Sequence, residues 1–345
     1  MLIQPHTLTF LTTNKCTAAC EHCCFGCSPK RTGAIGIERI LSLIDEAAAV
    51  PSIRVVVFSG GECFLLGDDL DRAVARANAA GYITRCVTNG YWAHSAKATQ
   101  QRIERLLDAG LKEINFSTGA FHARYVPVDR IIEGAVASAE AGLNTLVNVE
   151  ICEQSDFDFE GLRNHPRISP LFEAGRLRLQ RNLWIESDGT VPLSHDPEHQ
   201  RYRDDRISAC QTVMKVLAVT PELDLVACCG LHLRRIPDLT LGNVAERSIR
   251  EALDHAPDDL LKIWLHTDGP ERILQFVARH QPDCPIPEGS VHPCESCHYI
   301  YHTEQVREVL RRHAGQVEDE VMEKYMVSLA AGLLSNRVLD EFSSE

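Results

Sequence analysis

The feature that most constrains this chain is a run of three cysteines close to its first residues. Cys16, Cys20 and Cys23 follow a short apolar segment, residues 8–11, that is typical of a strand. Thiolates ligate iron–sulfur clusters, and a four-iron cluster has four irons to ligate. Three closely spaced thiolates hold three of these irons and leave the fourth open to another molecule. Zinc sites also gather cysteines at short spacing, so the run alone does not separate the two metals.

A glycine-rich turn follows the next predicted strand. Residues 53–58 form an apolar run that is typical of a buried parallel strand, and the run leads into Ser59, Gly60, Gly61 and Glu62. With the cysteine run before it, this turn resembles the radical S-adenosylmethionine (SAM) enzymes. The resemblance implies that the three cysteines ligate a [4Fe-4S] cluster whose open iron binds SAM. It also implies that the backbone of the Gly-Gly-Glu turn contacts the methionine part of SAM.

Strand-like and helix-like segments alternate along the first half of the chain. Strands are predicted at residues 8–13, 53–58, 82–88, 112–117, 144–151 and 176–181. Helices are predicted at residues 36–49, 68–80, 96–109 and 128–141. Repeated strand–helix pairs imply a parallel sheet with right-handed crossovers. The alternation alone equally allows a doubly wound sheet, whereas the resemblance implies an α/β fold built as a partial (βα)6 radical SAM barrel.

In such a barrel the chemistry gathers at the C-terminal ends of the strands. The residues there to which the resemblance gives a part in cofactor binding are Ser59, Gly60, Gly61, Glu62, Thr88, Asn89, Ser117, Asn148, Glu150 and Arg178. Many relatives carry an Asp at the position of Gly119, so any role of that Asp is lost or moved here. The alternative for Glu150 is a paired carboxylate in the core. The alternative for Arg178 is a solvated position on an edge strand.

A second group of cysteines follows residue 200. Two of them bracket residues 217–227, which are typical of a β-hairpin with its turn at residues 221–224, and two more form a Cys-x2-Cys pair. This arrangement resembles the twitch and SPASM extensions of radical SAM enzymes. The resemblance implies one auxiliary [4Fe-4S] cluster ligated by Cys210, Cys228, Cys294 and Cys297.

The ligand set of this second group has two open points. Leu223 stands where the family has a glycine in the hairpin turn, so Cys229 remains an alternative to Cys228. A structural zinc site that uses the same four thiolates is the alternative to a cluster. The resemblance nevertheless covers nearly the whole chain. It implies a barrel over residues 1–200, an auxiliary-cluster domain with a hairpin and helices over 201–302, and a helical tail over 303–345.

Other reactive residues have no assigned role. The further cysteines are Cys24, Cys27, Cys63, Cys86, Cys152 and Cys284. Free cysteine usually packs in the core, and the alternative is that one of them donates a hydrogen atom to a substrate radical. His122 and Arg124 lie in the loop after the fourth strand, where loops carry function. They either contact a substrate or bond to neighbouring backbone.

Composition excludes several classes of protein. The chain has 345 residues, 14 of them Cys, and shows no secretory signal, which indicates a reducing compartment such as the cytoplasm and metal chemistry rather than disulfides. Its net charge of -13 argues against a general nucleic-acid binder, because phosphate backbones demand a basic face. No segment approaches the roughly 18 apolar residues of a membrane span.

The expected activity follows from the resemblance. One electron from a flavodoxin- or ferredoxin-like reductant would cleave SAM to a 5′-deoxyadenosyl radical, which would take a hydrogen from the substrate. Relatives with such extensions mature ribosomal peptides, and this is the activity we expect. Radical oxidation, epimerisation or rearrangement of a small natural product is the alternative, favoured by the lack of an extra domain before the first strand. An iron–sulfur electron carrier or sensor is the non-enzyme alternative, but a carrier needs no Gly-Gly-Glu turn.

Overall fold

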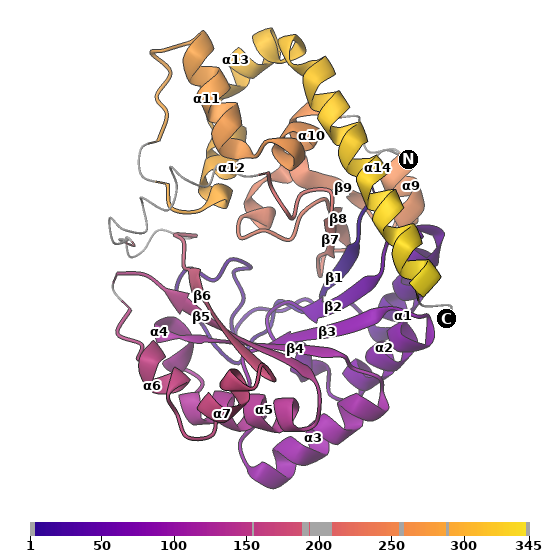
Figure 1. Ribbon diagram of the computed structural model, residues 1–345, viewed down its shortest axis with the longest axis vertical. Coiled ribbons are helices and arrows are strands. Elements are labelled where there is room, and N and C mark those ends of the chain that lie inside the picture. The colour runs from indigo at the N-terminus through magenta and orange to yellow at the C-terminus, as the bar shows by residue number, and fades with distance from the viewer. Residues whose placement is uncertain are drawn as a thin grey trace.

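The computed structural model describes residues 4–342 apart from 154, 188–192, 194–208, 255–258 and 288–289, with side chains described as far as residue 331. The described residues form one nine-stranded sheet in the order β6-β5-β4-β3-β2-β1-β7-β8-β9. Figure 1 shows this sheet in the lower part of the molecule, with helices α10 to α13 gathered above it. The sheet is open, because β6 and β9 are its two edges.

The first six strands form the part of the sheet that the sequence predicts. Their bounds are β1 Thr7–Leu11, β2 Val55–Ser59, β3 Ile83–Thr88, β4 Glu113–Gly119, β5 Asn144–Ile151 and β6 Leu177–Leu183. All neighbouring pairs among them are parallel. Their spatial order follows the chain without a reversal, whereas a doubly wound sheet grows on both sides of its first strand. The partial barrel is therefore confirmed, and the doubly wound alternative is wrong.

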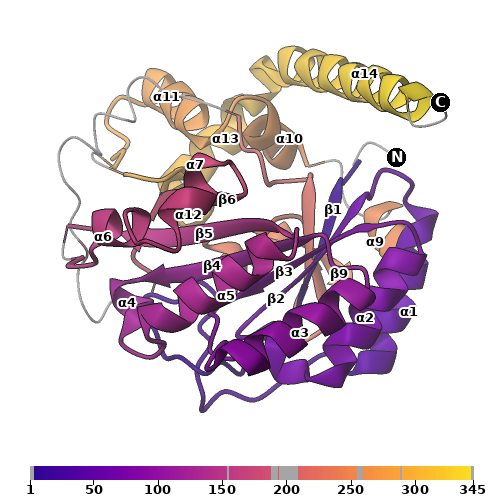
Figure 2. The same ribbon diagram turned by 60° about the horizontal axis from the view of Figure 1, so that its bottom comes forward.

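Amphipathic helices cover one face of this sheet. The connecting helices are α1 Ile37–Glu46, α2 Asp68–Ala79, α3 Ala96–Asp108, α4 Ala120–Ala123, α5 Val128–Glu140, α6 Phe159–Arg163 and α7 Ser169–Glu173. Figure 2 shows α1, α2, α3 and α5 side by side in front of the strands. In α1 the buried residues are Ile40, Leu43 and Ile44, a spacing that places them on one side of a helix. Under these helices Phe10 of β1 stacks on Phe58 of β2, and both rings are fully buried.

The C-terminal part of the chain adds to the barrel sheet at its β1 edge. Its strands are β7 Val216–Val219, β8 Asp224–Val226 and β9 Thr240–Asn243. β7 pairs in parallel with β1, and β8 and β9 continue antiparallel. The predicted hairpin is present as β7–β8, and its pairing with β1 brings it beside the cysteine loop that follows β1.

Helices complete the C-terminal part. They are α9 Ile249–Asp254, α10 Leu260–Thr267, α11 Pro270–His280, α12 Pro293–His302, α13 Glu304–His313 and α14 Glu318–Phe342. Short 3-10 turns are η1 Ala47–Ala49, η2 Cys63–Leu66, η3 Leu233–Arg235, η4 Pro237–Leu239 and η5 Ala314–Gln316. The expected boundary between residues 200 and 201 lies outside the described residues. Within the described residues, no helix combines the length and the apolar character needed to span a membrane.

Candidate functional site

The loop between β1 and α1 carries the first three cysteines and folds back on itself. Near its base, the Asn14 N–H donates to the Gly33 carbonyl at 2.9 Å, and the Cys16 N–H donates to the Ser28 carbonyl at 3.2 Å. The Ser28 N–H in turn donates to the Asn14 carbonyl at 3.4 Å. These backbone bonds close the base of the loop, and the three cysteines all lie within the closed loop.

The three thiols of this loop lie within electrostatic reach of one another. Cys16, Cys20 and Cys23 are all partly buried. Burial raises the pKa of Cys16 to about 11, and the charges of Glu62 and Cys23 act in the same direction. Burial also raises the pKa of Cys20, with further contributions from Cys23 and Cys16. A hydrogen bond from the Cys27 thiol lowers the pKa of Cys23 to about 6. Cys23 is therefore poised to be a thiolate, the form in which a cysteine ligates metal.

The donor set of the loop suits an iron–sulfur cluster. Across the part of the chain that the structure describes, no three His, Cys, Asp or Glu side chains converge closely enough to hold a single metal ion. A cluster does not need such convergence, because its irons occupy separate corners and thiolates bind them one at a time. Cys16, Cys20 and Cys23 are the residues that would hold three of those corners.

The Gly-Gly-Glu turn after β2 lies directly against this loop. The Gly61 N–H donates to the Thr13 carbonyl at 2.7 Å, and the Glu62 N–H donates to the Lys15 carbonyl at 3.1 Å. A Cβ atom on Gly61 would lie 2.1 Å from the Lys15 carbonyl oxygen, and Gly60 has a φ of +119°. Glycine is required at both positions, because any side chain would force the turn and the cysteine loop apart.

The Glu62 carboxylate is buried and forms hydrogen bonds within the protein. It is 1% exposed and accepts hydrogen bonds from the Thr88 hydroxyl at 2.9 Å and from the Asn89 N–H at 2.8 Å. Burial raises its pKa to about 7. Asn89 continues the connection, since its side-chain amide donates to the Thr17 hydroxyl at 2.9 Å and approaches the Cys16 sulfur at 3.5 Å. The ends of β2 and β3 are thus joined to the first cysteine.

Glu150 is buried at the end of β5, where it faces Gly119 of β4 across the sheet. Its carboxylate accepts from the Phe121 N–H at 2.8 Å and from the His122 N–H at 3.2 Å, and it lies 3.1 Å from Nδ1 of His122. A Cβ atom on Gly119 would lie 1.9 Å from this carboxylate. An Asp at position 119 would therefore clash with the Glu150 side chain in its present position. Where many relatives have that Asp, this protein has a carboxylate from β5 instead.

The remaining candidates for cofactor binding are Ser59, Ser117 and Asn148, which are buried or partly buried, and Arg178, which is exposed. Ser59, at the end of β2, is buried, and its carbonyl accepts from the Thr12 hydroxyl at 2.8 Å. Ser117 and Asn148 are opposite each other in the pairing of β4 and β5 and are partly buried. Arg178 is exposed near the start of β6 and donates to Asn144 at 3.2 Å. The structure does not bring Arg178 to the cysteine loop, because the edge strand turns its side chain toward solvent at the opposite end.

Further aromatic and polar side chains contact the cysteine loop, and of these Trp184 and Ser187 were not predicted from the sequence whereas Arg124 was a candidate. The Trp184 ring NH donates to the Glu21 carbonyl at 3.1 Å, and the ring stacks on Phe121 with centroids 6.0 Å apart. The Ser187 hydroxyl donates to the Cys23 carbonyl at 3.3 Å. Arg124 pairs with the Glu21 carboxylate at 3.1 Å. The contacts to Glu21 and Cys23 join segments more than one hundred residues apart, so no local sequence pattern predicts them.

The second group of thiols is brought together by the hairpin and α12. The Thr212 hydroxyl lies 3.4 Å from the Cys210 sulfur and 3.5 Å from the Cys228 sulfur. A Cβ atom on Gly230 would lie 3.1 Å from the sulfurs of both Cys228 and Cys294. Burial raises the pKa of Cys297, and the charges of Cys228, Cys294 and Cys210 raise it further. The sulfurs of Cys210, Cys228 and Cys294 therefore lie near one another, and Cys297 is within electrostatic reach of all three.

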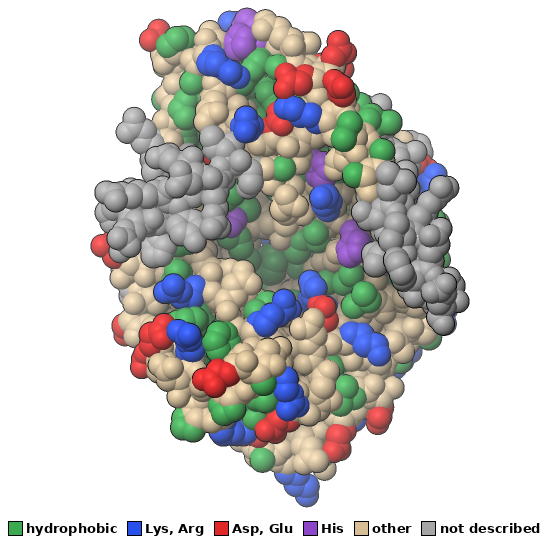
Figure 3. Space-filling model, viewed as in Figure 1, with side chains coloured by type: hydrophobic (Ala, Val, Ile, Leu, Met, Phe, Trp, Pro, Cys, Tyr) green, Lys and Arg blue, Asp and Glu red, His purple; other side chains and the backbone are tan. Residues whose placement is uncertain are grey.

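The Cys229 thiol contacts Thr9 of β1 rather than the thiols of this group. Burial raises its pKa to about 11, and a hydrogen bond with the Thr9 side chain of β1 acts against that rise. Burial raises the pKa of Cys24, and the charges of Cys23, Cys229 and Cys294 raise it further, so this thiol is within electrostatic reach of both groups. The two groups of cysteines are thus neighbours in space. In Figure 3 the surface is hollowed between the strands and the C-terminal helices.

Comparison with known proteins gives a family and two similar solved structures. Residues 10–152 match the model of the Radical SAM superfamily. Among curated proteins, the chain is 29% identical over 120 residues to "Putative peptide biosynthesis protein YydG" of Bacillus subtilis (strain 168), a match that covers 35% of this chain and 38% of that protein. The chain thus spans less than half the length of the curated relative that it matches.

The solved structures agree over a larger part of the chain. Native anSMEcpe with bound AdoMet has a TM-score of 0.54 at 12% identity, covering 92% of this chain and 100% of that one. The same protein with bound AdoMet and Cp18Cys peptide has a TM-score of 0.51 at 12% identity, covering 92% and 99%. At this identity the likeness concerns the fold.

Proposed function

We propose that this chain, whose residues 10–152 match the radical SAM superfamily, is an enzyme of that superfamily and matures a ribosomally made peptide by removing a hydrogen atom from it. The observation that carries the proposal is the cysteine loop, which holds three thiols together and is bonded through its backbone to Gly61 and Glu62. A [4Fe-4S] cluster on this loop would supply an electron that splits bound SAM into methionine and a 5′-deoxyadenosyl radical.

The chain's own residues would hold and enclose the reactants. Cys16, Cys20 and Cys23 would ligate the cluster, and the backbone of Gly60 and Gly61 would lie against the methionine part of SAM. Glu62 would position this turn rather than bind SAM through its carboxylate, because both carboxylate oxygens already accept hydrogen bonds within the protein. Phe121 and Trp184 would exclude water from the cysteine loop, which protects a radical from side reactions.

The peptide substrate is supported by the matched proteins. YydG is described as a peptide biosynthesis protein, and one of the similar structures holds a bound peptide. The hollow between the barrel and the C-terminal helices offers a surface for such a chain (Figure 3). The reductant would be a flavodoxin- or ferredoxin-like protein, since the reaction consumes one electron for each SAM cleaved.

We extend the proposal to a second cluster. Cys210, Cys228, Cys294 and Cys297 would ligate an auxiliary [4Fe-4S] cluster of the twitch or SPASM kind in residues 201–302. The choice of Cys228 over Cys229 is supported by the contact of the Cys228 sulfur with Thr212, which also contacts Cys210. Four thiolates close such a cluster, so that it would pass electrons or hold substrate rather than bind SAM.

A direct experiment tests the central step. Anaerobically reconstituted protein with strong reductant and SAM is expected to release 5′-deoxyadenosine, measured by chromatography. A Cys16→Ala, Cys20→Ala, Cys23→Ala variant should release none, and a Cys86→Ala variant serves as the matched control because that thiol is buried on β3. Release of S-adenosylhomocysteine alone would show that the assigned chemistry is wrong.

The substrate class needs its own experiment. Short peptides encoded beside this chain would be produced together with it in cells and examined by mass spectrometry. A change in peptide mass or in the configuration of one residue, absent with the triple Cys→Ala variant, is expected. Turnover of a small molecule with every such peptide left unchanged would contradict peptide maturation.

A further inference from the structure

The hairpin of the C-terminal part touches the base of the cysteine loop. Glu222, in the turn between β7 and β8, accepts a hydrogen bond at 2.9 Å from the side-chain amide of Asn14. Asn14 lies two residues before the first cysteine, and its backbone closes the loop on Gly33. A Cβ atom on Gly33 would lie 2.9 Å from the Asn14 side-chain nitrogen, so glycine at this position leaves the room that the Asn14 amide occupies.

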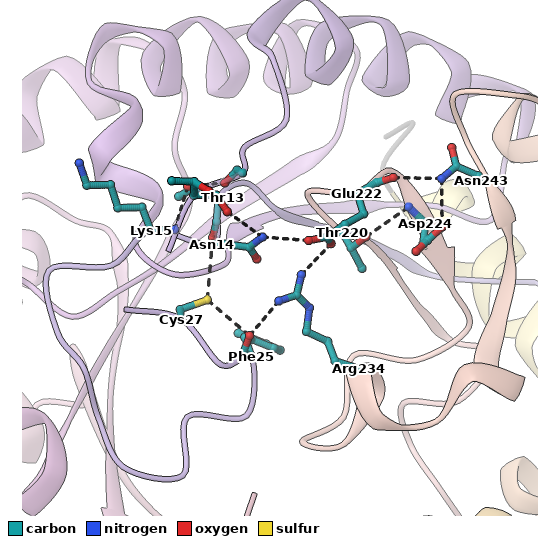
Figure 4. A network of polar contacts seen from close by, with 12 residues as sticks. Thr13, Asn14, Lys15, Phe25, Cys27, Thr220, Glu222, Asp224, Arg234 and Asn243 are labelled. Carbon is teal, nitrogen blue, oxygen red and sulfur yellow. Dashed lines mark hydrogen bonds and ion pairs between the residues drawn. The ribbon is translucent and has the colours of Figure 1, made fainter. Parts of the chain in front are cut away.

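The Arg234 guanidinium hydrogen-bonds both to the hairpin and to the segment of the cysteine loop around Phe25. Arg234 donates through Nη1 to the Phe25 carbonyl at 2.9 Å and through Nη2 to the Glu222 carboxylate at 2.7 Å. Figure 4 shows Arg234 between these two partners, with Cys27 and Asn14 beside them. The Arg234 side chain is 24% exposed, so its charge is partly shielded from solvent. A planar guanidinium suits this task, because it presents several donors in a fixed fork.

The segment around Phe25 includes the Cys27 thiol, which hydrogen-bonds to the sulfur of Cys23. Cys27 follows Phe25 by two residues, and its thiol donates to Cys23. The Gly26 N–H, between Phe25 and Cys27, donates to the Cys23 carbonyl at 2.8 Å. The segment that Arg234 contacts is therefore bonded directly to Cys23, one of the three candidate cluster ligands.

Arg234 is held in place from the side of the second thiol group. It lies in η3, and the Leu233 N–H before it donates to the Gly230 carbonyl at 3.2 Å. The Gly230 N–H itself donates to the Cys228 sulfur at 3.0 Å. The Glu222 carbonyl accepts from Asn243 of β9 at 3.0 Å. Both ends of the Arg234–Glu222 pair thus rest on the C-terminal part.

We propose that Arg234, paired with Glu222, is a positioning residue for the cluster on Cys16, Cys20 and Cys23, and that its charge favours reduction of that cluster. The inference rests on the proposed function, because it assumes a cluster on this loop. Reduction adds a negative charge, and a nearby cation stabilises the reduced form more than the oxidised one. The bond to the Phe25 carbonyl keeps the guanidinium at a constant place relative to Cys23 and Cys27.

The test is the midpoint potential of the cluster whose EPR signal changes when SAM is added, measured by redox titration of reconstituted full-length protein. Arg234→Met removes the charge and should shift the potential to a more negative value. Glu222→Gln leaves the Arg234 charge uncompensated and should shift it to a more positive value. The double variant should return toward the wild-type potential. Arg312→Met is the matched control, because Arg312 is exposed on α13 and pairs with Glu308.

Opposite shifts separate a charge effect from damage to the fold, since damage would move both single variants in one direction. Arg234→Lys keeps the charge but not the fork, so its potential should stay near that of the wild type while iron is lost faster on storage. Unchanged potentials in both single variants, with a SAM-responsive cluster in the wild type, would overturn this inference alone. A wild-type protein with no such cluster would overturn the proposed function together with it. Loss of the cluster from Arg234→Met supports positioning, and the Glu222→Gln potential then decides the charge effect.

Discussion

At the scale of single residues, Gly119 and Glu150 form a matched pair across β4 and β5. Glu150 fills the space that a side chain at position 119 would need, and Gly119 has a φ of +135°, which glycine adopts far more readily than other residues. Two backbone N–H groups donate to Oε1 of this carboxylate, and Oε2 lies 3.1 Å from Nδ1 of His122. The two positions are therefore expected to tolerate change only together.

Gly119→Asp should lower the free energy of unfolding by roughly 2–4 kcal/mol, because it adds backbone strain, a clash and a second carboxylate. Adding Glu150→Ala should recover part of this loss, which chemical denaturation of the metal-free protein would measure as a coupling between the sites. Gly142→Ala is the control, since Gly142 has a φ of +91° with open space around it. Additive effects at positions 119 and 150 would contradict the pairing.

Glu62 should make stability depend on pH. Its folded-state pKa of about 7 lies above the ordinary value of 4.5, so the folded protein keeps a proton that the unfolded chain has lost. The proton contributes its full stabilisation at pH values below the ordinary pKa of 4.5, and this stabilisation is lost as the pH rises through about 7. Between these limits the wild type should lose roughly 3 kcal/mol relative to Glu62→Gln. Denaturation curves at several pH values that stay parallel for the two proteins would refute this expectation.

At the scale of elements, α12 presents two cysteines in its first turns. His292 precedes the helix and accepts from the Cys294 N–H at 3.1 Å, and Glu295 completes a capping box. Burial lowers the pKa of His292 to about 4, so the ring is neutral near pH 7 and keeps a lone pair for this bond. The start of the helix, and with it the direction of Cys294, therefore depends on the cap.

His292→Ala should weaken this cap by about 1 kcal/mol and speed the loss of metal from the second thiol group. His292→Asn, which can accept the same hydrogen bond, should restore metal retention. The measurement is iron content after timed exposure of reconstituted protein to a chelator. Ser95→Ala, which removes the cap of α3, is the control for a general loss of helix stability. Equal retention in the Ala and Asn variants would exclude a role for the cap.

At the scale of the whole molecule, the C-terminal part extends the barrel sheet and carries its thiols to the neighbourhood of the cysteine loop. β7 pairs with β1, and the charges of thiols from both groups raise the pKa of Cys24. This arrangement predicts a division of labour between a cluster with an open iron and one closed by four thiolates. The two should then be separable by mutation.

Reconstituted protein should hold about eight irons, and Cys16→Ala, Cys20→Ala, Cys23→Ala protein about four. Cys294→Ala, Cys297→Ala protein should still release 5′-deoxyadenosine while its substrate is left unchanged or diverted. Circular dichroism comes first, because a cluster that joins distant segments also stabilises them. Zinc in place of a second iron cluster, or wild-type substrate turnover by the double variant, would contradict this division.

The sequence by itself determined the features that depend on near neighbours. The period of apolar residues predicted the six strands, the helices between them and the hairpin, and the structure confirms each of these elements with small shifts at their ends. The close spacing of Cys16, Cys20 and Cys23 predicted a shared metal site for the same reason, since one loop can bring them together. Gly60 and Gly61 stood out because the turn, together with the cysteine run before it, resembles that of the radical SAM enzymes.

Only the tertiary structure decided the features that join distant segments. It sets Arg178 in solvent on the edge strand, places the Glu150 carboxylate in the space beside Gly119, and turns the sulfur of Cys228 rather than that of Cys229 toward Cys210. The bond from Arg234 to Phe25 crosses 209 residues of chain. No local pattern encodes such contacts, because they depend on how the pairing of β7 with β1 and the twist of the whole sheet bring the ends of separate strands together.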